Sequence, residues 1–260
     1  MKLHKIRSCL FQKTIVITGA SRGIGREIAL RCAKDQANLV LIARSGTEPS
    51  HKKLHGSLSE TKDSVEKLGG QAYVLPLDIS KNGMQDHVEE IVSRFGAIDC
   101  IINNASAIDI SKRTSLKNYD MMMNVNVRGT MNTIESFYEE LEKSDLRHVL
   151  SISPPLKTLD LKWLHPHPPY STSKYAMSMI TLGYSDIFRA NSIWPKKLIR
   201  TAATKMLEEK TNIPAFSKGL DPSVFANTVH NIICSDLSGF SGLDDEIEPV
   251  NENGIDDIFI

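Results

Sequence analysis

The chain has 260 residues, of which 41% are hydrophobic and 24% are charged. This length and composition suit one complete α/β domain with an ordinary water-facing surface. The 31 Lys and Arg residues balance the 31 Asp and Glu residues, so charge gives no reason to expect nucleic acid or an anionic membrane as a partner. No apolar run approaches the roughly 20 residues of a spanning helix, and we expect no membrane span.

The cysteines are scattered along the sequence, at Cys9, Cys32, Cys100 and Cys234. No two of them have the C-x-x-C spacing typical of a zinc site or a redox pair. We therefore expect no metal site and no disulfide framework, and this usage favours a soluble protein in a reducing compartment inside the cell.

Short β-branched runs alternate with helical stretches along the chain. In chain order, the pattern predicts strand Thr14–Thr18, helix Gly23–Asp35, strand Asn38–Ala43, helix Leu58–Leu68, strand Gln71–Leu77, helix Met84–Phe95, strand Ile98–Ile102, helix Leu116–Glu142, strand His148–Ile152 and helix Pro169–Phe188. Near-continuous apolar strands joined by helices indicate a parallel sheet buried on both faces. Because such crossovers are right-handed, the fold class is α/β, a single doubly wound Rossmann-type sheet in one domain over residues 1–260.

The segment Thr18–Gly25, TGASRGIG, joins the first strand to the first helix. Its glycines allow a sharp turn and a close approach of the backbone to a pyrophosphate. The helix N-terminus adds free N–H groups and a partial positive charge. This context predicts nucleotide binding, and the alternative is a purely structural turn.

A cation ends the second strand. An NAD-selective site would carry Asp or Glu there to hold the ribose hydroxyls, whereas this sequence has Arg44. Arg22 lies within the glycine loop, and guanidinium groups suit the geometry of a 2′-phosphate. The pattern favours NADP(H) over NAD(H), and the alternative is a pair of solvated surface arginines.

Two further features lie at strand ends or beyond them. Asn104, in Asn103-Asn104-Ala105-Ser106 after the fourth strand, could stabilise the loop, contact the adenosine ribose or form an Asx-turn.

Tyr170 and Lys174 share one helix face. We expect the Lys174 ammonium to lower the phenol pKa, so that Tyr170 exchanges a proton with a carbonyl or alcohol while hydride moves to or from a nicotinamide.

Four ordered segments, TGASRGIG, NNAS, NVN and YSTSK, make residues 8–235 resemble the short-chain dehydrogenase/reductase family. The resemblance implies that Tyr170 transfers the proton, Lys174 holds the nicotinamide ribose and Asn126 holds a proton-relay water. It implies cofactor binding by Gly19, Ser21, Arg22, Gly23, Ile24, Gly25, Arg44, Asp78, Asn104, Lys174, Ile193 and Thr201.

Within that family, the segments Met121–Thr130, Ser151–Leu156 and Ile193–Ala203 resemble a lipid-related subgroup. This likeness implies a lipid-like carbonyl or alcohol as substrate, such as a steroid or fatty acyl derivative. It also implies a peroxisomal or mitochondrial location, with the cytoplasm expected if no targeting signal operates. The basic start Met1–Phe11 suits either a mitochondrial transit segment or a plain lead-in. A homo-oligomer stays open, and we expect the chain to stop before the sterol-carrier-like domain of that subgroup.

Three departures bear on activity. Pro154 occupies the position of the family's catalytic serine, and Ser153 lies one residue early; proline offers no side-chain hydrogen bond. The sixth strand is expected to be shortened, because Phe188–Pro195 leaves little room between the preceding helix and the strand. Gly242-Leu243-Asp244-Asp245 stands where an apolar seventh strand is expected. These departures favour, as an alternative to an oxidoreductase, a catalytically weak or inactive NADP(H)-binding protein with an accessory or sensing role in lipid metabolism.

The remaining candidates are weaker. His165 and His167 lie in the loop Pro154–Pro169, which we interpret as a cover over the substrate rather than a metal site. The run Met121–Met123 is typical of core or interface packing. Residues 244–260 are expected to form a partly ordered, acidic tail.

Overall fold

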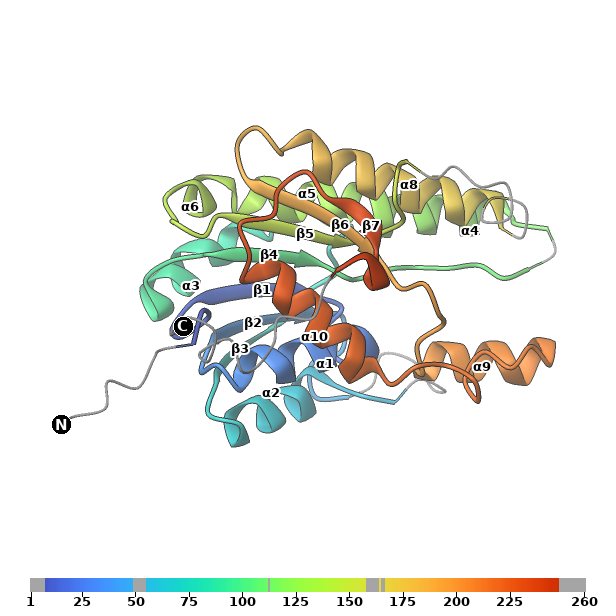
Figure 1. Ribbon diagram of the computed structural model, residues 1–260, viewed down its shortest axis with the longest axis horizontal. Coiled ribbons are helices and arrows are strands. Elements are labelled where there is room, and N and C mark those ends of the chain that lie inside the picture. The colour runs from blue at the N-terminus through green and yellow to red at the C-terminus, as the bar shows by residue number, and fades with distance from the viewer. Residues whose placement is uncertain (1–7, 49–54, 112, 158–163, 165–166, 248–260) are drawn as a thin grey trace, which may run out of the picture.

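The computed structural model describes residues 8–48, 55–111, 113–157, 164 and 167–247. Within these ranges seven parallel strands form one sheet in the order β3-β2-β1-β4-β5-β6-β7 (Figure 1). The strands are β1 Thr14–Thr18, β2 Asn38–Ala43, β3 Gln71–Pro76, β4 Cys100–Asn103, β5 His148–Ile152, β6 Arg189–Trp194 and β7 Ser241–Leu243. The strand order reverses between β1 and β4, which is where open α/β sheets bind ligands at the carboxyl ends of their strands.

Helices cover both faces of the sheet (Figure 1). They are α1 Gly23–Ala33, α2 Leu58–Lys67, α3 Val88–Phe95, α4 Leu116–Met122, α5 Gly129–Ser136, α6 Tyr138–Glu142, α8 Pro168–Gly183, α9 Ala202–Thr211 and α10 Pro222–Ile233. In Figure 1, α1, α2 and α10 lie on one side of the sheet, and α4, α5, α6 and α8 lie on the other.

Alternation along the strands divides the core into two layers. In β1, Ile15 and Ile17 belong to the layer beneath α1 and α10, whereas Val16 belongs to the opposite layer. Successive strand side chains point to opposite faces, so a strand buried on both faces must be apolar at every position. Phe225 of α10 fills the first layer and Phe137 the second, and both are fully buried. Each such side chain contributes about 1.5–3 kcal/mol through its burial.

The fold class is confirmed, with differences at particular elements. The strands β1, β2 and β5 have the predicted bounds. The predicted helix Leu116–Glu142 is divided into α4, a π-helix over Met123–Arg128, α5 and α6. The helices α9 and α10 were not predicted.

The expectation of a shortened sixth strand is wrong. The helix α8 ends at Gly183 rather than at Phe188, and a turn over residues 184–188 then leaves room for six residues in β6. The seventh strand is short as expected, with three residues. Beyond it, Asp244–Glu246 form a 3₁₀ turn, while residues 248–260 of the expected tail, and His165 of the loop, lie outside the described residues.

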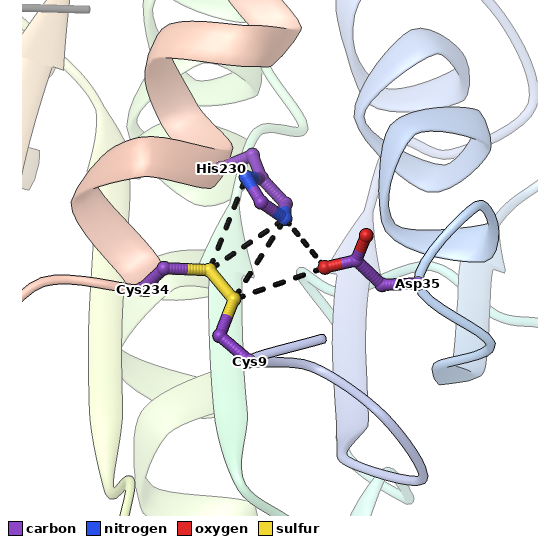
Figure 2. A group of neighbouring side chains, drawn as sticks. All are labelled: Cys9, Asp35, His230 and Cys234. Carbon is purple, nitrogen blue, oxygen red and sulfur yellow. Dashed lines mark hydrogen bonds and ion pairs between the residues drawn. A yellow bond between two sulfur atoms is a disulfide. The ribbon is translucent and has the colours of Figure 1, made fainter. Parts of the chain in front are cut away.

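Two of the cysteines are paired. Cys9, before β1, and Cys234, at the end of α10, form a disulfide with a Cα–Cα distance of 5.8 Å (Figure 2). The scattered spacing, from which we expect no disulfide framework, does not predict this pair, because 225 residues of chain separate the two cysteines and only the fold brings them together. None of the described helices is long and apolar enough to cross a membrane.

Candidate active site

The glycine loop is shaped by close contacts with the end of β4. Gly19 has a positive φ of 69°, a conformation that favours glycine. A Cβ on Gly25 would lie 2.5 Å from the Gly19 carbonyl oxygen and even closer to the Asn104 amide nitrogen. No side chain fits at that position, so the backbone of the loop can approach α1 and β4 directly.

Asn104 fastens this loop. Its Nδ2 donates to the carbonyl oxygens of Thr18 at 2.9 Å and of Gly19 at 3.2 Å. The backbone N–H groups of Asn104 and Ala105 both donate to Thr18 Oγ1 at 3.1 Å. Of the roles left open by the sequence, the side-chain contacts therefore correspond to stabilising the loop.

A cleft of about 340 Å³ opens above the carboxyl ends of the strands. Its walls include most of the residues expected to hold a cofactor, namely Gly19, Ser21, Arg22, Gly23, Ile24, Arg44, Asp78, Asn104 and Thr201. Gly25 lies behind the loop, and Ile193 is fully buried within β6. Neither these two residues nor the expected site residues Tyr170 and Lys174 belong to the cleft wall formed by the described residues.

Two guanidinium groups lie at the β2 side of the cleft. Burial, together with repulsion from Arg44, lowers the pKa of Arg22 from its ordinary value. Arg44 itself is exposed. An anion between or beside two like charges removes their repulsion and accepts charge-assisted hydrogen bonds.

The carboxylate of Asp78 is oriented by its own turn after β3. Its Oδ1 accepts from the backbone N–H of Ser80 at 3.0 Å and from Ser80 Oγ at 2.7 Å. This pair of hydrogen bonds fixes the side chain at the cleft wall.

Tyr170 lies in the first turn of α8, beside Ser106 of the loop after β4. Burial of the phenol raises its pKa to about 12, and a hydrogen bond with the Ser106 side chain lowers it in part. Ser106 also lines the cleft. Its position in the N-N-A-S segment placed it near the site, but no spacing rule in the sequence indicated a contact with Tyr170.

Lys174 is 2% exposed and points to β5. Its Nζ donates to the Ile152 carbonyl oxygen at 2.6 Å, lies 3.1 Å from Met177 Sδ and stands 5.4 Å from the centre of the Trp194 ring. Burial lowers its pKa to about 7. The structure therefore differs from the expectation that this ammonium lowers the phenol pKa, because the amine is held by a backbone carbonyl and burial raises the Tyr170 pKa instead.

Asn126, inside the π-helix, braces the site. Its Oδ1 accepts from the Ala107 N–H at 2.7 Å, and its Nδ2 donates to the Ala107 carbonyl oxygen at 2.9 Å and to Ser173 Oγ at 2.8 Å. The side chain thus ties the loop after β4 to α8, next to Tyr170. A π-helical turn inside α-helices often marks a functional site.

The Ser153 hydroxyl is fully enclosed. Its Oγ is buried and has no hydrogen-bond partner among the described residues, and it is not part of the cleft wall. The next residue, Pro154, contributes only its carbonyl oxygen, which accepts from Ser178 Oγ at 2.6 Å. The described structure therefore places no hydroxyl from this strand end in the cleft.

Comparison with known proteins identifies the class that this fold and cleft define. The sequence profile of short chain dehydrogenases matches residues 13–194. The chain belongs to the short-chain dehydrogenase/reductase family, and membership of this family supports an oxidoreductase.

The chain is also similar in sequence to a particular member of this family. The chain is 38% identical over 259 residues to hydroxysteroid dehydrogenase-like protein 2 of Xenopus laevis. The matched region covers 94% of this chain and 59% of that protein. The chain thus spans about three fifths of the relative's length.

Solved structures share the fold. A short chain dehydrogenase from Mycobacterium thermoresistibile matches with a TM-score of 0.81 and 34% identity over 91% of this chain and 86% of that one. Two more distant ones, both at 21% identity and a TM-score of 0.73 over 91% of this chain, are a Mycobacterium paratuberculosis enzyme bound to NAD, covered over 98% of its length, and a Burkholderia cenocepacia enzyme in complex with NADP, covered over 97%.

Proposed function

We propose that the protein is an NADP(H)-dependent oxidoreductase that interconverts a carbonyl and an alcohol on a lipid-like substrate. The observation that carries this proposal is the arrangement of the cleft, with the Arg22 and Arg44 guanidinium groups at one end and Ser106, hydrogen-bonded to Tyr170, in its wall. The guanidinium groups suit a phosphate, and the Tyr170 phenol, which contacts the wall through Ser106, is a proton donor.

The residues fit the cofactor. The backbone around Gly19 and Gly25 leaves no space for a Cβ, which is the close approach that a pyrophosphate at the N-terminus of α1 requires. Ser21, Gly23 and Ile24 would hold the phosphates there. Arg22 and Arg44 would hold the 2′-phosphate, Asp78 would contact the adenine, and Thr201, which caps α9, would border the nicotinamide end.

The bound cofactor would supply or accept the hydride, and the chain's own residues would handle the proton. Because burial raises the pKa of Tyr170 to about 12, its Oη carries a proton at neutral pH and can donate it to a carbonyl oxygen. Ser106 orients this phenol. Lys174 and Asn126 act as positioning residues, since Lys174 holds the end of β5 and Asn126 holds the start of α8.

The lipid-like substrate is supported by similarity and by the composition of the wall. Relatives are named hydroxysteroid dehydrogenase-like protein 2, and the apolar side chains of Met121 and Val125 contribute to the cleft. The same relationship favours the peroxisome or mitochondrion over the cytoplasm and leaves a homo-oligomer open.

A second candidate is a cofactor-binding protein with little or no catalysis. Pro154 and the enclosed Ser153 hydroxyl favour it, because a hydrogen bond aimed at developing charge is commonly worth about 10²–10³ in rate. Consumption of NADPH with a panel of steroid and fatty acyl carbonyls separates the two candidates. Turnover that disappears in Tyr170→Phe supports the oxidoreductase, and NADPH binding without turnover on any substrate supports the second candidate.

A further inference from the structure

Four side chains that can bind metal ions lie close together (Figure 2). Cys9 comes from the segment before β1, Asp35 follows α1, and His230 and Cys234 belong to α10 and its end. Their candidate donor atoms all lie within 4.8 Å of one another. None of the four belongs to the cleft wall, so the cluster is separate from the proposed active site.

We propose that these four side chains bind one Zn²⁺ ion when the Cys9–Cys234 disulfide is reduced. Structural zinc sites use four Cys, His or carboxylate donors in a tetrahedron with bonds of about 2.0–2.3 Å, which places donors about 3.3–3.8 Å apart. Thiolate and imidazole donors select zinc over magnesium or calcium.

Four of the six separations between the donors can be compared with that tetrahedron, and the two sulfur atoms, which are bonded in the disulfide, must move apart on reduction. Cys9 Sγ lies 3.8 Å from Asp35 Oδ2 and 3.9 Å from His230 Nε2. Cys234 Sγ lies 3.5 Å from the same His230 nitrogen. Asp35 Oδ2 and His230 Nε2 are 2.7 Å apart, the length of a hydrogen bond, and an ion would take the place of the proton that they share.

Charge and burial suit a bound dication. Two thiolates and one carboxylate carry three negative charges, Zn²⁺ supplies two positive charges and Arg31 supplies the third. Arg31 Nη1 lies 3.1 Å from Asp35 Oδ1 and leaves Oδ2 turned to the cluster. The side chains of Asp35 and His230 are only 11% and 9% exposed. Such outer hydrogen bonds commonly orient the ligands of a metal site.

Reduction of the disulfide supplies the two sulfur donors. A phosphine reductant and water convert the disulfide to two thiols and the phosphine to its oxide. Zn²⁺ then displaces one proton from each thiol and forms two zinc–sulfur bonds. Because the donors come from three segments, the ion would fasten the chain before β1 to α10 and to the end of α1, and would stabilise the folded state by linkage.

The test uses the full chain, reduced without oxygen and freed of phosphine. Titration with Co²⁺ should give one ion per chain, the intense visible bands of tetrahedral cobalt and a near-ultraviolet thiolate-to-cobalt band. Zn²⁺ should then displace the cobalt and raise the Tm. Each of Cys9→Ser, Cys234→Ser, Asp35→Asn and His230→Gln should weaken zinc binding by at least about tenfold.

The matched control is Cys32→Ala, which removes a buried thiol on α1 outside the cluster and should keep wild-type zinc affinity. Circular dichroism checks that each variant is folded. The proposal is overturned if the reduced wild type binds zinc no more tightly than the Cys9→Ser/Cys234→Ser double variant, or if the cobalt complex lacks the thiolate band. Either result would mean that the four side chains do not form a zinc site.

Discussion

The two halves of the sheet hold their predicted site residues through different kinds of contact. Around the glycine loop between β1 and β4, the Thr18 hydroxyl and the Asn104 amide nitrogen form hydrogen bonds with neighbouring backbone atoms, while the adjacent Asn103 side chain is buried without a partner among the described residues. Around β5 and α8, the Ser153 hydroxyl is buried without a partner among the described residues, and the Lys174 amine is satisfied by a carbonyl and a sulfur. Each half therefore contains a buried polar side chain without such a partner. The glycine loop depends on the shape of its backbone, whereas the second half supplies the side chains for which we propose chemical roles.

The largest expected effect comes from a substitution of Tyr170, in the second half. Tyr170→Phe should lower turnover by about 10²–10⁴-fold, because the phenol proton is lost. NADPH affinity should stay within a few-fold, since the ring is retained. Steady-state rates and a cofactor titration measure the two quantities. Tyr184→Phe, at the other end of α8, is the matched control and should keep wild-type rates. Full activity in Tyr170→Phe would show that another group transfers the proton.

The corresponding substitution in the first half is Gly25→Ala. The new methyl group would collide with the Gly19 carbonyl and the Asn104 amide, and overpacking of this kind costs about 1–3 kcal/mol. NADPH affinity should fall by roughly 10–100-fold, measured by fluorescence titration. Gly183→Ala is the control, because nothing lies within 4 Å of a Cβ there. Unchanged affinity in a folded Gly25→Ala protein would contradict the described loop.

Stability should depend on pH through the second half. His148 is fully buried, its Nε2 is 2.9 Å from Asn191 Nδ2, and burial lowers its pKa from 6.5 to about 3. Below pH 6.5 the unfolded chain binds this proton and the folded chain does not, so the contribution to stability falls as pH falls toward 3. Between pH 7 and 5 the wild type should lose about 2 kcal/mol more than His148→Gln. Denaturant unfolding measures this difference, and parallel pH profiles for the two proteins would contradict it.

The smallest expected effect concerns Ser153. Because its hydroxyl is enclosed, Ser153→Ala should keep turnover within roughly threefold, or about 0.6 kcal/mol. Pro154→Ser should be faster than the wild type if the strand end lacks a group that orients the substrate oxygen. A loss of about 10²–10³-fold in Ser153→Ala would instead show that this hydroxyl reaches the substrate.

The sequence predicted the parts of the molecule that depend on local pattern. The runs of β1, β2 and β5 are short, largely apolar and contain β-branched residues, which favours buried strands. The segment Thr18–Gly25 contains the end of a strand, a turn and the start of a helix in consecutive residues. Arg22 and Arg44 were found from their positions relative to these elements, and both line the cleft.

Other features depend on contacts between distant segments. The full length of β6 follows from the end of α8 at Gly183, and no proline marks this end. The contact between Ser106 and Tyr170, and the meeting of Cys9 with Cys234, require the tertiary fold. For Lys174, the i to i+4 spacing indicated a shared face but not that the amine would turn to Ile152.

A titration of the wild-type protein with NADPH and NADH tests most directly the proposal that the cleft selects NADP(H). Two guanidinium groups should make NADPH bind at least about tenfold more tightly, since a charge-assisted hydrogen bond is worth roughly 1.5–3 kcal/mol. Arg44→Asp should remove this preference, whereas Arg128→Asp, which makes the same charge change at an exposed position outside the cleft, should keep it. Equal affinities of the wild type for the two cofactors would contradict the account.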